Sequence, residues 1–304
     1  MKQSVTIKVD PSILIDIKNH YAQYEINNDG EYVLFCANYH GIIITIFDSK
    51  KENKTVTFIG EDALKEAKLF DENASIKEKK EIAPKGGWIN VESQIGSDEV
   101  GVGDFLLPLI VVAAFVRKKD MKMLKEHGVT DSKKLTDEQI MEIGEALAGK
   151  FFFSKLTLSN EKYNELVAKG ENLNSIKAKM HNRALLNLFK KFPDTKYIFI
   201  DQFCAENKYY SYLNDRNETQ VTNVIFKTKG ETYYPSVALA SVMARYSFLK
   251  EKKKLENKYH MTFPFGASSK VDEFAKMFLE KYGLEELDKI VKKNFANYKK
   301  LIEK

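Results

Sequence analysis

Cysteine is scarce in this sequence: Cys36 and Cys204 are its only two, and they lie far apart. This excludes a disulfide framework and the closely spaced cysteines of a structural zinc site. Long apolar runs are scarce as well. The longest, residues 105–116, contains Pro108 and is shorter than the roughly 20 residues that cross a bilayer. The first residues lack the apolar core and cleavage site of a secretory signal, so we expect a cytoplasmic protein without a membrane segment.

Charge of one sign is not strongly in excess either. The 48 Lys and Arg residues exceed the 43 Asp and Glu residues by a net charge of +5. Such an excess fits a polyanionic partner but is too small to identify one. What the chain does have is length, because 304 residues can form one full-sized domain and a smaller second one.

Residues 1–70 have the pattern of a small α+β domain. Residues 4–9 alternate apolar and polar side chains, and Asp10 and Pro11 then suit the N-cap and first position of a helix. Three further strand-like runs follow at residues 31–39, 41–49 and 55–60, and a polar hairpin at residues 50–54 joins the last two. An amphipathic helix at residues 61–70 closes the domain. We expect an antiparallel sheet with helices on one face, and its other face is free to lie along a nucleic acid or a neighbouring domain.

Residues 71–90 interrupt this pattern. They are rich in charged residues, poor in large apolar ones, and contain Pro84, Gly86 and Gly87 near their end. We interpret them as a linker. The larger domain then spans residues 91–304.

Two buried strands are expected in the larger domain. Residues 105–116 are nearly all apolar and rich in β-branched side chains, which is typical of a strand covered on both faces. Residues 196–203 form a second such run after a helical pattern over residues 175–191, and Asp201 directly follows its apolar residues. Ligands of open α/β sheets bind at the carboxyl ends of strands, and a buried acid there requires a cation. Asp201 is therefore a candidate metal ligand.

Asp98 and Glu99 form an acidic pair that is followed closely by Gly101 and Gly103. Consecutive residues of a strand point to opposite faces, so both acids can reach one ion only if the strand is interrupted. We expect the two glycines to supply this interruption and to let a polymer backbone approach closely.

Glu231 adds a fourth carboxylate. It follows Gly230 and precedes a helix that begins near Pro235. Small residues would let this helix pack close to the sheet and bring Glu231 to the same crevice: Ala238, Ala240, Ser241 and Ala244. Four carboxylates without a Cys or His ligand pattern favour Mg²⁺ or Mn²⁺ over zinc. Two such ions, roughly 3.5 to 4 Å apart, support phosphodiester hydrolysis, so we expect a nuclease.

Segments of the chain resemble, in order, the motifs of bacterial ribonuclease HIII, a family similar to ribonuclease HII. They are GSDEVGVGD (96–104), VTDSKKLTDEQI (129–140), NLNSIKAKMHNRAL (172–185), YIFIDQF (197–203), TKGETYYPSVALASVMARYSFL (228–249) and FPFGASSKVDEF (263–274). The resemblance implies an α/β ribonuclease-H-like catalytic domain over residues 91–304, with a mixed central sheet flanked by helices. It also implies that residues 1–70 form a substrate-binding α+β domain resembling half of the TATA-box-binding protein.

The resemblance further implies endonucleolytic hydrolysis of the RNA strand of RNA–DNA hybrids by two-metal-ion catalysis, with 5′-phosphate and 3′-hydroxyl ends. Two Mg²⁺ or Mn²⁺ ions are expected in the reacting complex, and no obligate protein partner is implied. The metal-binding acids of the family correspond to Asp98, Glu99, Asp201 and Glu231. Ribonuclease HII usually has Asp at the last position, so Glu231 and the additional domain favour HIII. One departure is at Leu106 and Leu107, where family members usually have a glycine-containing turn.

Substrate contacts are expected next to the acids. Gly101, Val102 and Gly103 would bring the backbone against the 2′-hydroxyls that distinguish RNA from DNA. Ser132 and Lys133 would contact phosphate, although a helix cap followed by solvated lysines explains them as well. Ribonuclease HII has Arg at the position of Val102. We therefore expect recognition to need several consecutive ribonucleotides, with little activity on a single embedded one.

Some motif residues also have a structural explanation. His181 lies in the middle of a helix and is expected to be a structural histidine, and Tyr233 and Tyr234 are expected to pack in the core. Two alternatives to a ribonuclease are a non-catalytic nucleic-acid-binding protein with structural acids and another nuclease of the same fold, such as a junction resolvase. The complete acidic set favours the ribonuclease.

Overall fold

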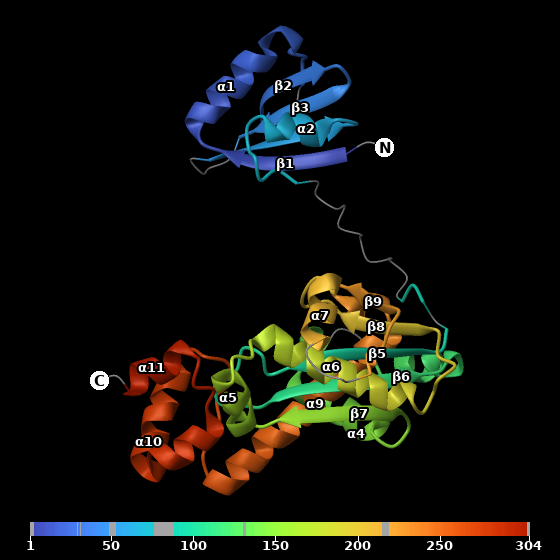
Figure 1. Ribbon diagram of the computed structural model, residues 1–304, viewed down its shortest axis with the longest axis vertical. Helices are drawn as coiled ribbons and strands as arrows, with labels where there is room; N and C mark the ends of the chain where they lie inside the picture. The colour runs from blue at the N-terminus through green and yellow to red at the C-terminus, as the bar shows by residue number, and fades with distance from the viewer. Residues whose placement is uncertain are drawn as a thin grey trace. The chain divides into compact units, whose positions relative to one another are not determined.

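The computed structural model describes residues 3–28, 30, 32–48, 53–75, 88–90, 92–129, 132–214 and 219–302. The chain divides into two compact units, Met1–Ile82 and Ala83–Lys304 (Figure 1). Each unit has its own hydrophobic core. Most of the expected linker, residues 76–87, lies outside the described residues. Within the ranges given above, no helix is both long and apolar enough to cross a membrane.

The first unit contains an antiparallel sheet of four strands in the order β1-β4-β3-β2. Its elements follow the expected sequence: β1 (Gln3–Val9), α1 (Pro11–Tyr21), η1 (Ala22–Tyr24), β2 (Val33–Tyr39), β3 (Ile42–Phe47), β4 (Lys54–Gly60) and α2 (Ala63–Lys68). Asp10 caps α1 as expected, because its carboxylate accepts hydrogen bonds from the N–H groups of Ser12 and Ile13. β3 pairs with β4, which confirms the expected hairpin, although its turn at 49–52 lies outside the described part.

Both helices of the first unit pack on one face of its sheet. Val5 of β1, Ile17 of α1 and Ala63 of α2 belong to a single core, which also includes Ala74. The other face carries a row of threonines that are aligned by the strand register, Thr6, Thr57 and Thr45. That face mixes polar and apolar side chains, since the strand register also places Lys8 and Ile59 on it, and among the described residues no helix covers it, which agrees with the free face that the sequence predicts.

The second unit contains a mixed sheet of five strands in the order β7-β6-β5-β8-β9. These strands are β5 (Gln94–Val100), β6 (Leu109–Val116), β7 (Phe152–Leu158), β8 (Tyr197–Asp201) and β9 (Val224–Lys227). β5, β6 and β7 are antiparallel neighbours, whereas β8 runs parallel to both β5 and β9. The expected mixed sheet is confirmed. The strand expected over residues 105–116 starts only at Leu109, because Pro108 has no backbone N–H and the chain bends before it.

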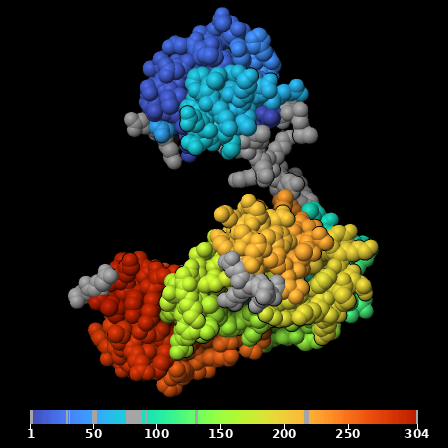
Figure 2. All heavy atoms as spheres, viewed as in Figure 1, coloured from blue at the N-terminus to red at the C-terminus, as the bar shows by residue number. Residues whose placement is uncertain are grey.

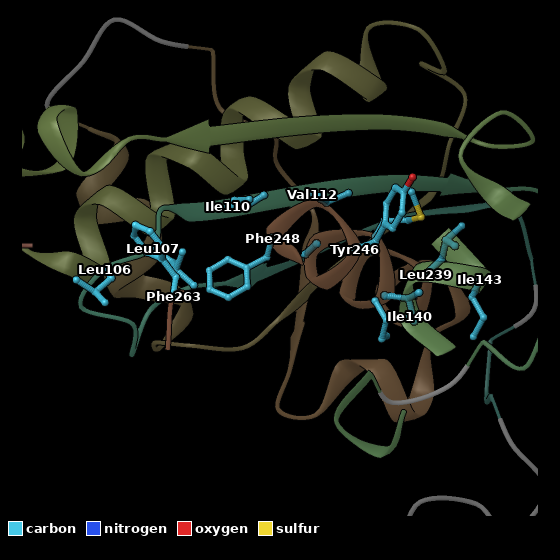
Figure 3. Packing of buried hydrophobic residues seen from close by; sticks show 14 of the residues in the cluster. Leu106, Leu107, Ile110, Val112, Ile140, Ile143, Leu239, Tyr246, Phe248 and Phe263 are labelled. Atoms are coloured by element: carbon cyan, nitrogen blue, oxygen red, sulfur yellow. The ribbon is translucent and has the colours of Figure 1, made fainter. Parts of the chain in front are cut away.

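Helices cover both faces of this sheet. α9 (Pro235–Tyr259) packs on one face together with α4 (Asp137–Leu147), and α6 (Leu173–Phe189) packs on the other together with α7 (Glu206–Leu213). Alternate residues of β6 belong to the two cores: Ile110 and Val112 pack with α9, and Val111 and Ala113 pack with α6. Figure 3 shows the first of these cores, with Ile110 and Val112 of the strand above side chains of α9 and α4.

α9 lies very close to β5, as its small residues predict. A Cβ atom at Gly96 would lie 2.4 Å from Ser236 Oγ and 2.5 Å from the backbone nitrogen of Val237. The residue before α9, Tyr234, stacks on Phe199 of β8 with ring centroids 3.7 Å apart. Tyr233 and Tyr234 are both 7% exposed, which confirms that they pack in the core.

The remaining helices of the second unit are short or lie in its last third. They are η2 (Lys118–Asp120), α3 (Met121–Glu126), η3 (Ser132–Lys134), α5 (Asn160–Ala168), α8 (Gly230–Tyr233), α10 (Ser269–Ile290) and α11 (Ala296–Ile302). α10 packs on α5 and α11. In Figure 2 these C-terminal helices form a red lobe against the green-yellow surface of the middle of the chain.

Candidate active site

Three of the four expected acids lie together at one edge of the mixed sheet. β5 carries Asp98 and Glu99 near its carboxyl end, and the parallel strand β8 ends at Asp201. Parallel neighbours deliver their last residues to the same edge, which is where ligands of such sheets bind. All three acids line one pocket of about 550 Å³.

The expected interruption of the strand at the acidic pair is wrong. β5 continues through both residues, and Asp98 and Glu99 pair in register with Val112 and Val111 of β6. Asp98 is therefore on the α9 face and Glu99 on the α6 face. Both still border the pocket, because the pairing of β5 with β8 stops at Ser97 and leaves that edge of β5 open beyond it.

Gly101 ends β5. Its φ of +88° is in the left-handed region, and a Cβ atom there would lie 2.1 Å from the carbonyl oxygen of Pro108. Gly103 is different, since its φ is not in that region and an added Cβ would meet no atom within 4 Å. The first glycine is thus required by the fold, whereas the second leaves an exposed, open backbone.

Asp98 and Asp201 lie in a buried environment with other carboxylates close by. Burial is the main cause that raises the pKa of Asp98 well above its usual value, and Asp201 and Glu99 raise it further. The pKa of Asp201 is also raised, mainly by burial, while a hydrogen bond from the Gly230 N–H to its Oδ1 at 2.8 Å opposes this. Asp98 accepts a hydrogen bond from the N–H of Glu99 at 2.7 Å and one from Ser241.

Glu99 is held in the ionised form by two side chains of α6. Lys177 Nζ lies 2.9 Å from Oε1, and His181 Nε2 lies 2.9 Å from Oε2. Burial raises the pKa of Glu99, but these two contacts dominate and lower it to about 2. The other ring nitrogen of His181, Nδ1, lies 2.8 Å from Ser97 Oγ. His181 is fully buried with both nitrogens bonded, so it is a structural histidine that supports a candidate ligand.

Glu231 lies beside this group on α8. The hydrogen bond from Gly230 to Asp201 brings the start of α8 to the end of β8. The side chain of Glu231 is 3% exposed, and its Oε1 lies 3.8 Å from Lys133 Nζ. Lys133 lines the pocket, so the buried Glu231 lies directly behind a residue of the pocket wall.

The expected substrate-binding residues all line the same pocket: Gly101, Val102, Gly103, Ser132 and Lys133. The Lys133 side chain is 78% exposed. Ser132 Oγ lies 2.7 Å from Ser241 Oγ. Ser241 also bonds Asp98, so the two hydroxyls connect Ser132 to the acidic group.

Sequence reasoning missed further residues of the pocket. Arg245 lines it and donates from Nε and Nη2 to Asp137 Oδ1 at 3.1 and 2.8 Å. Its guanidinium also lies over the ring of Phe265, 4.4 Å from the centroid. Ser241 and Arg245 are four residues apart on α9 and so share one helix face, which is the signal that could have found them.

The donor set of the pocket fits a hard divalent cation. Within the described part of the chain, no three His, Cys, Asp or Glu side chains are already spaced to hold an ion. However, the charge of Asp201 raises the pKa of Asp98, and a divalent cation between such carboxylates would remove this repulsion. The oxygen donors match Mg²⁺ and Mn²⁺, as the sequence predicts.

Comparison with known proteins identifies the family. A family model described as ribonuclease HII matches residues 95–298, and a model described as a domain of unknown function, DUF3378, matches residues 4–82. The chain is 40% identical over 310 residues to ribonuclease HIII of Bacillus anthracis, with coverage of 99% of this chain and 98% of that protein. The chain belongs to the ribonuclease HIII family. Ribonucleases HII and HIII are the type 2 ribonucleases H, which are endoribonucleases that act on RNA–DNA hybrids. The chain is therefore an enzyme of this class, and the expected fold, family and enzyme class are confirmed.

Solved structures of ribonuclease HIII have the same fold. The crystal structure of Bst-RNase HIII in complex with Mn²⁺ is 31% identical, with a TM-score of 0.69 and coverage of 99% of this chain and 98% of that one. Aquifex aeolicus RNase H3 is 23% identical with a TM-score of 0.54, covers 96% of this chain and 100% of that one, and supports the fold alone. The roles of individual residues in this chain stay predictions.

Proposed function

We propose that this ribonuclease hydrolyses the RNA strand of RNA–DNA hybrids with the help of two divalent ions, Mg²⁺ or Mn²⁺, and leaves 5′-phosphate and 3′-hydroxyl ends. The observation that carries this proposal is the pocket lined by Asp98, Glu99 and Asp201, with Glu231 adjacent. The similarity to Bst-RNase HIII, whose structure contains Mn²⁺, supports the choice of metal. We also propose action in the cytoplasm without an obligate protein partner.

The four acids would hold the ions: Asp98, Glu99, Asp201 and Glu231. When bound, the ions would activate water and stabilise the charge on the attacking and leaving oxygens of the phosphodiester. The protein contributes the orientation of these ligands. Lys177 and His181 fix both carboxylate oxygens of Glu99, and the Glu99 N–H and Ser241 fix Asp98.

Recognition of RNA would come from the loop that follows β5. Gly101, Val102 and Gly103 line the pocket next to the acids and can offer backbone groups to ribose 2′-hydroxyls. Val102 has no side-chain donor, so contacts to several consecutive ribonucleotides would have to replace the charged fork of an arginine. The exposed ammonium of Lys133 would attract a phosphate.

A substrate panel tests this proposal. Wild-type enzyme should cut a hybrid with a continuous RNA strand, should cut a single ribonucleotide embedded in duplex DNA poorly, and should leave duplex DNA and four-way junctions intact. End analysis of the products should show 5′-phosphates. Comparable rates on the hybrid and on the single ribonucleotide with Mg²⁺ would contradict the proposed specificity, and cutting of junctions alone would favour a resolvase.

Asp98→Asn is the matched active-site variant. The amide keeps the volume of the side chain but removes a charge that the ions require, so we expect hybrid cleavage to fall by at least roughly a thousandfold. Hybrid binding, measured by fluorescence anisotropy, should stay within about threefold of wild type, because phosphate contacts dominate affinity. Near-normal turnover of Asp98→Asn would remove Asp98 from the metal site.

A further inference from the structure

Lys292 is a buried lysine that binds the loop between β5 and β6, residues 101–108, here called the glycine loop. Its side chain is 1% exposed. Its Nζ donates hydrogen bonds to the backbone carbonyls of Gly101, Asp104 and Leu107 at 2.8, 2.5 and 2.5 Å. Its own N–H donates to the carbonyl of Phe105 at 2.9 Å. Lys292, which belongs to the C-terminal part of the chain, thus binds four carbonyls of a loop at the active site.

The ammonium group of Lys292 matches these acceptors in number. A protonated lysine has three N–H donors and no acceptor, so the three side-chain contacts use its whole capacity. Burial lowers the pKa of Lys292 to about 7, and the Asp104 carboxylate opposes this shift. The carbonyl contacts favour the protonated form, because a neutral amine would leave one buried carbonyl without a donor. Burying an ammonium is costly, which indicates that this position serves a geometric purpose.

The segment that carries Lys292 is fixed to α5. Asn160 Nδ2 donates to the carbonyl of Ile290 at 2.6 Å, and Asn164 Nδ2 donates to that of Val291 at 2.8 Å. Asn164 Oδ1 also accepts a hydrogen bond from the N–H of Lys293 at 2.9 Å. The backbone on both sides of Lys292 is therefore held by side chains of another helix.

The inner side of the glycine loop is bound at further points. The N–H of Gly266 donates to Asp104 Oδ1 at 2.6 Å, and its carbonyl accepts from the N–H of Phe105 at 3.0 Å. Leu106 and Leu107 are buried, and Figure 3 shows them beside Phe263 in the core around α9. These two leucines, where the family usually has a glycine-containing turn, are thus absorbed by the core.

The outer side of the glycine loop faces the pocket. Residues 101–104 line it together with Asp98 and Glu99, and Gly103 is exposed. We propose that Lys292 is a positioning residue, which draws the carbonyls of the glycine loop to one point and thereby sets the part of the loop that recognises ribose 2′-hydroxyls. This inference rests on the proposed function, and it adds a residue that acts from behind the site without touching the substrate.

The test compares discrimination between two substrates. One is an RNA–DNA hybrid; the other is the same hybrid with 2′-fluoro groups in place of the 2′-hydroxyls around the cut. The ratio of their kcat/KM values is independent of the fraction of folded enzyme, so a purely structural defect leaves it unchanged. Wild type should prefer the hydroxyl substrate strongly, because a site built to bind a hydroxyl discriminates against an analogue without it.

Lys292→Met keeps an unbranched side chain that is one atom shorter and removes its donors. We expect its discrimination ratio to fall at least roughly tenfold, because the loop no longer presents its backbone correctly. Lys293→Met is the control, since Lys293 is the next residue and pairs with Asp288 at the surface. Its ratio should stay within about twofold of wild type, as expected for a surface ion pair. A folded Lys292→Met variant with an unchanged ratio would overturn the inference, and so would a wild-type ratio near one.

A second variant decides the question if Lys292→Met does not fold. Asn164→Ala removes two hydrogen bonds that hold the Lys292 segment but leaves the lysine in place. Its ratio should fall in the same direction by roughly threefold or more, since the anchor of Lys292 is loosened; an unchanged ratio would overturn the inference. A wild-type enzyme that cuts neither substrate would contradict the proposed function itself and remove the basis of this inference with it.

Discussion

Asp98 and Glu99 are neighbours on β5 that are held from opposite faces of the sheet. Ser241 of α9 contacts Asp98, whereas Lys177 and His181 of α6 contact Glu99. Each carboxylate is thus oriented by a different helix, and neither helix carries one of the four candidate ligands. Such supporting contacts set the direction of the lone pairs that a metal ion would use.

The contact between His181 and Glu99 can be tested by replacing the single residue His181. His181→Phe fills the space but cannot bond Glu99 or Ser97, so the carboxylate should lose its fixed orientation. We expect the Mg²⁺ concentration for half-maximal cleavage to rise roughly 10- to 100-fold, as for other residues that orient metal ligands. Titration of Mg²⁺ at saturating hybrid measures this effect.

His127→Phe is the control for this experiment. His127 contacts the carbonyl of Met123 away from the acids, so its replacement should leave the Mg²⁺ requirement unchanged. Melting curves of both variants check that each is folded. If His181→Phe has the Mg²⁺ dependence of wild type, His181 has no part in orienting Glu99.

The acids could be predicted from the sequence, but their supports could not. Asp201 stands out because it directly follows a buried apolar run, where a carboxylate favours a cation as its partner, and Asp98 and Glu99 stand out as an acidic pair before two closely spaced glycines. Lys177 and His181 are 78 and 82 residues from Glu99 and look like ordinary helix residues. Lys292 is hidden among many lysines, since its burial depends on contacts with a loop far away in the sequence.

At the scale of elements, close packing of α9 on β5 determines how the site is built. Gly96 allows the backbone of α9 to approach, and that approach brings Ser241 to Asp98 and Arg245 to the pocket. The small residues of α9 predicted this contact. The shared access of Asp98 and Glu99 to the pocket from a regular strand could not be predicted, because it depends on where the pairing of β5 with β8 stops.

Gly96→Ala tests the importance of this packing. Its new Cβ would lie 2.4 to 2.7 Å from atoms of Ser236 and Val237, so strand and helix must separate. We expect a loss of about 1–3 kcal/mol in the free energy of unfolding, as for other overpacked cores. Trp88, the only tryptophan of the chain, packs against the core of the second unit, so its fluorescence in urea reports on this unfolding.

Gly149→Ala provides the comparison. A Cβ at that glycine meets no atom within 4 Å, and its backbone is not in the left-handed region. The urea midpoint of this variant should equal or slightly exceed that of wild type, because alanine restricts the unfolded chain more than glycine does. Equal midpoints for the two variants would show that the α9–β5 contact adapts to the added methyl group.

At the scale of the whole molecule, the chain combines two units with separate cores. The order of strands and helices in the first unit could be predicted because its polar and apolar residues alternate cleanly. Its role could not, since a sheet face without a helix suits a nucleic acid and a neighbouring domain equally well. Thr6 and Thr57, which are paired across β1 and β4 on that face, offer hydroxyl donors of the kind that contact phosphates.

Deletion of residues 1–82 separates these two roles. Because the second unit has its own core, the fluorescence of Trp88 should show an almost unchanged urea midpoint. If the first unit binds the hybrid backbone, the dissociation constant of the hybrid should rise by roughly tenfold or more. The slope of log affinity against log salt concentration should become less steep by about one for each phosphate that the truncated enzyme no longer binds. At saturating hybrid, kcat should stay within about threefold of wild type, because the acids and the glycine loop all belong to the second unit. A truncated enzyme with wild-type affinity at every salt concentration would assign the first unit a role other than substrate binding.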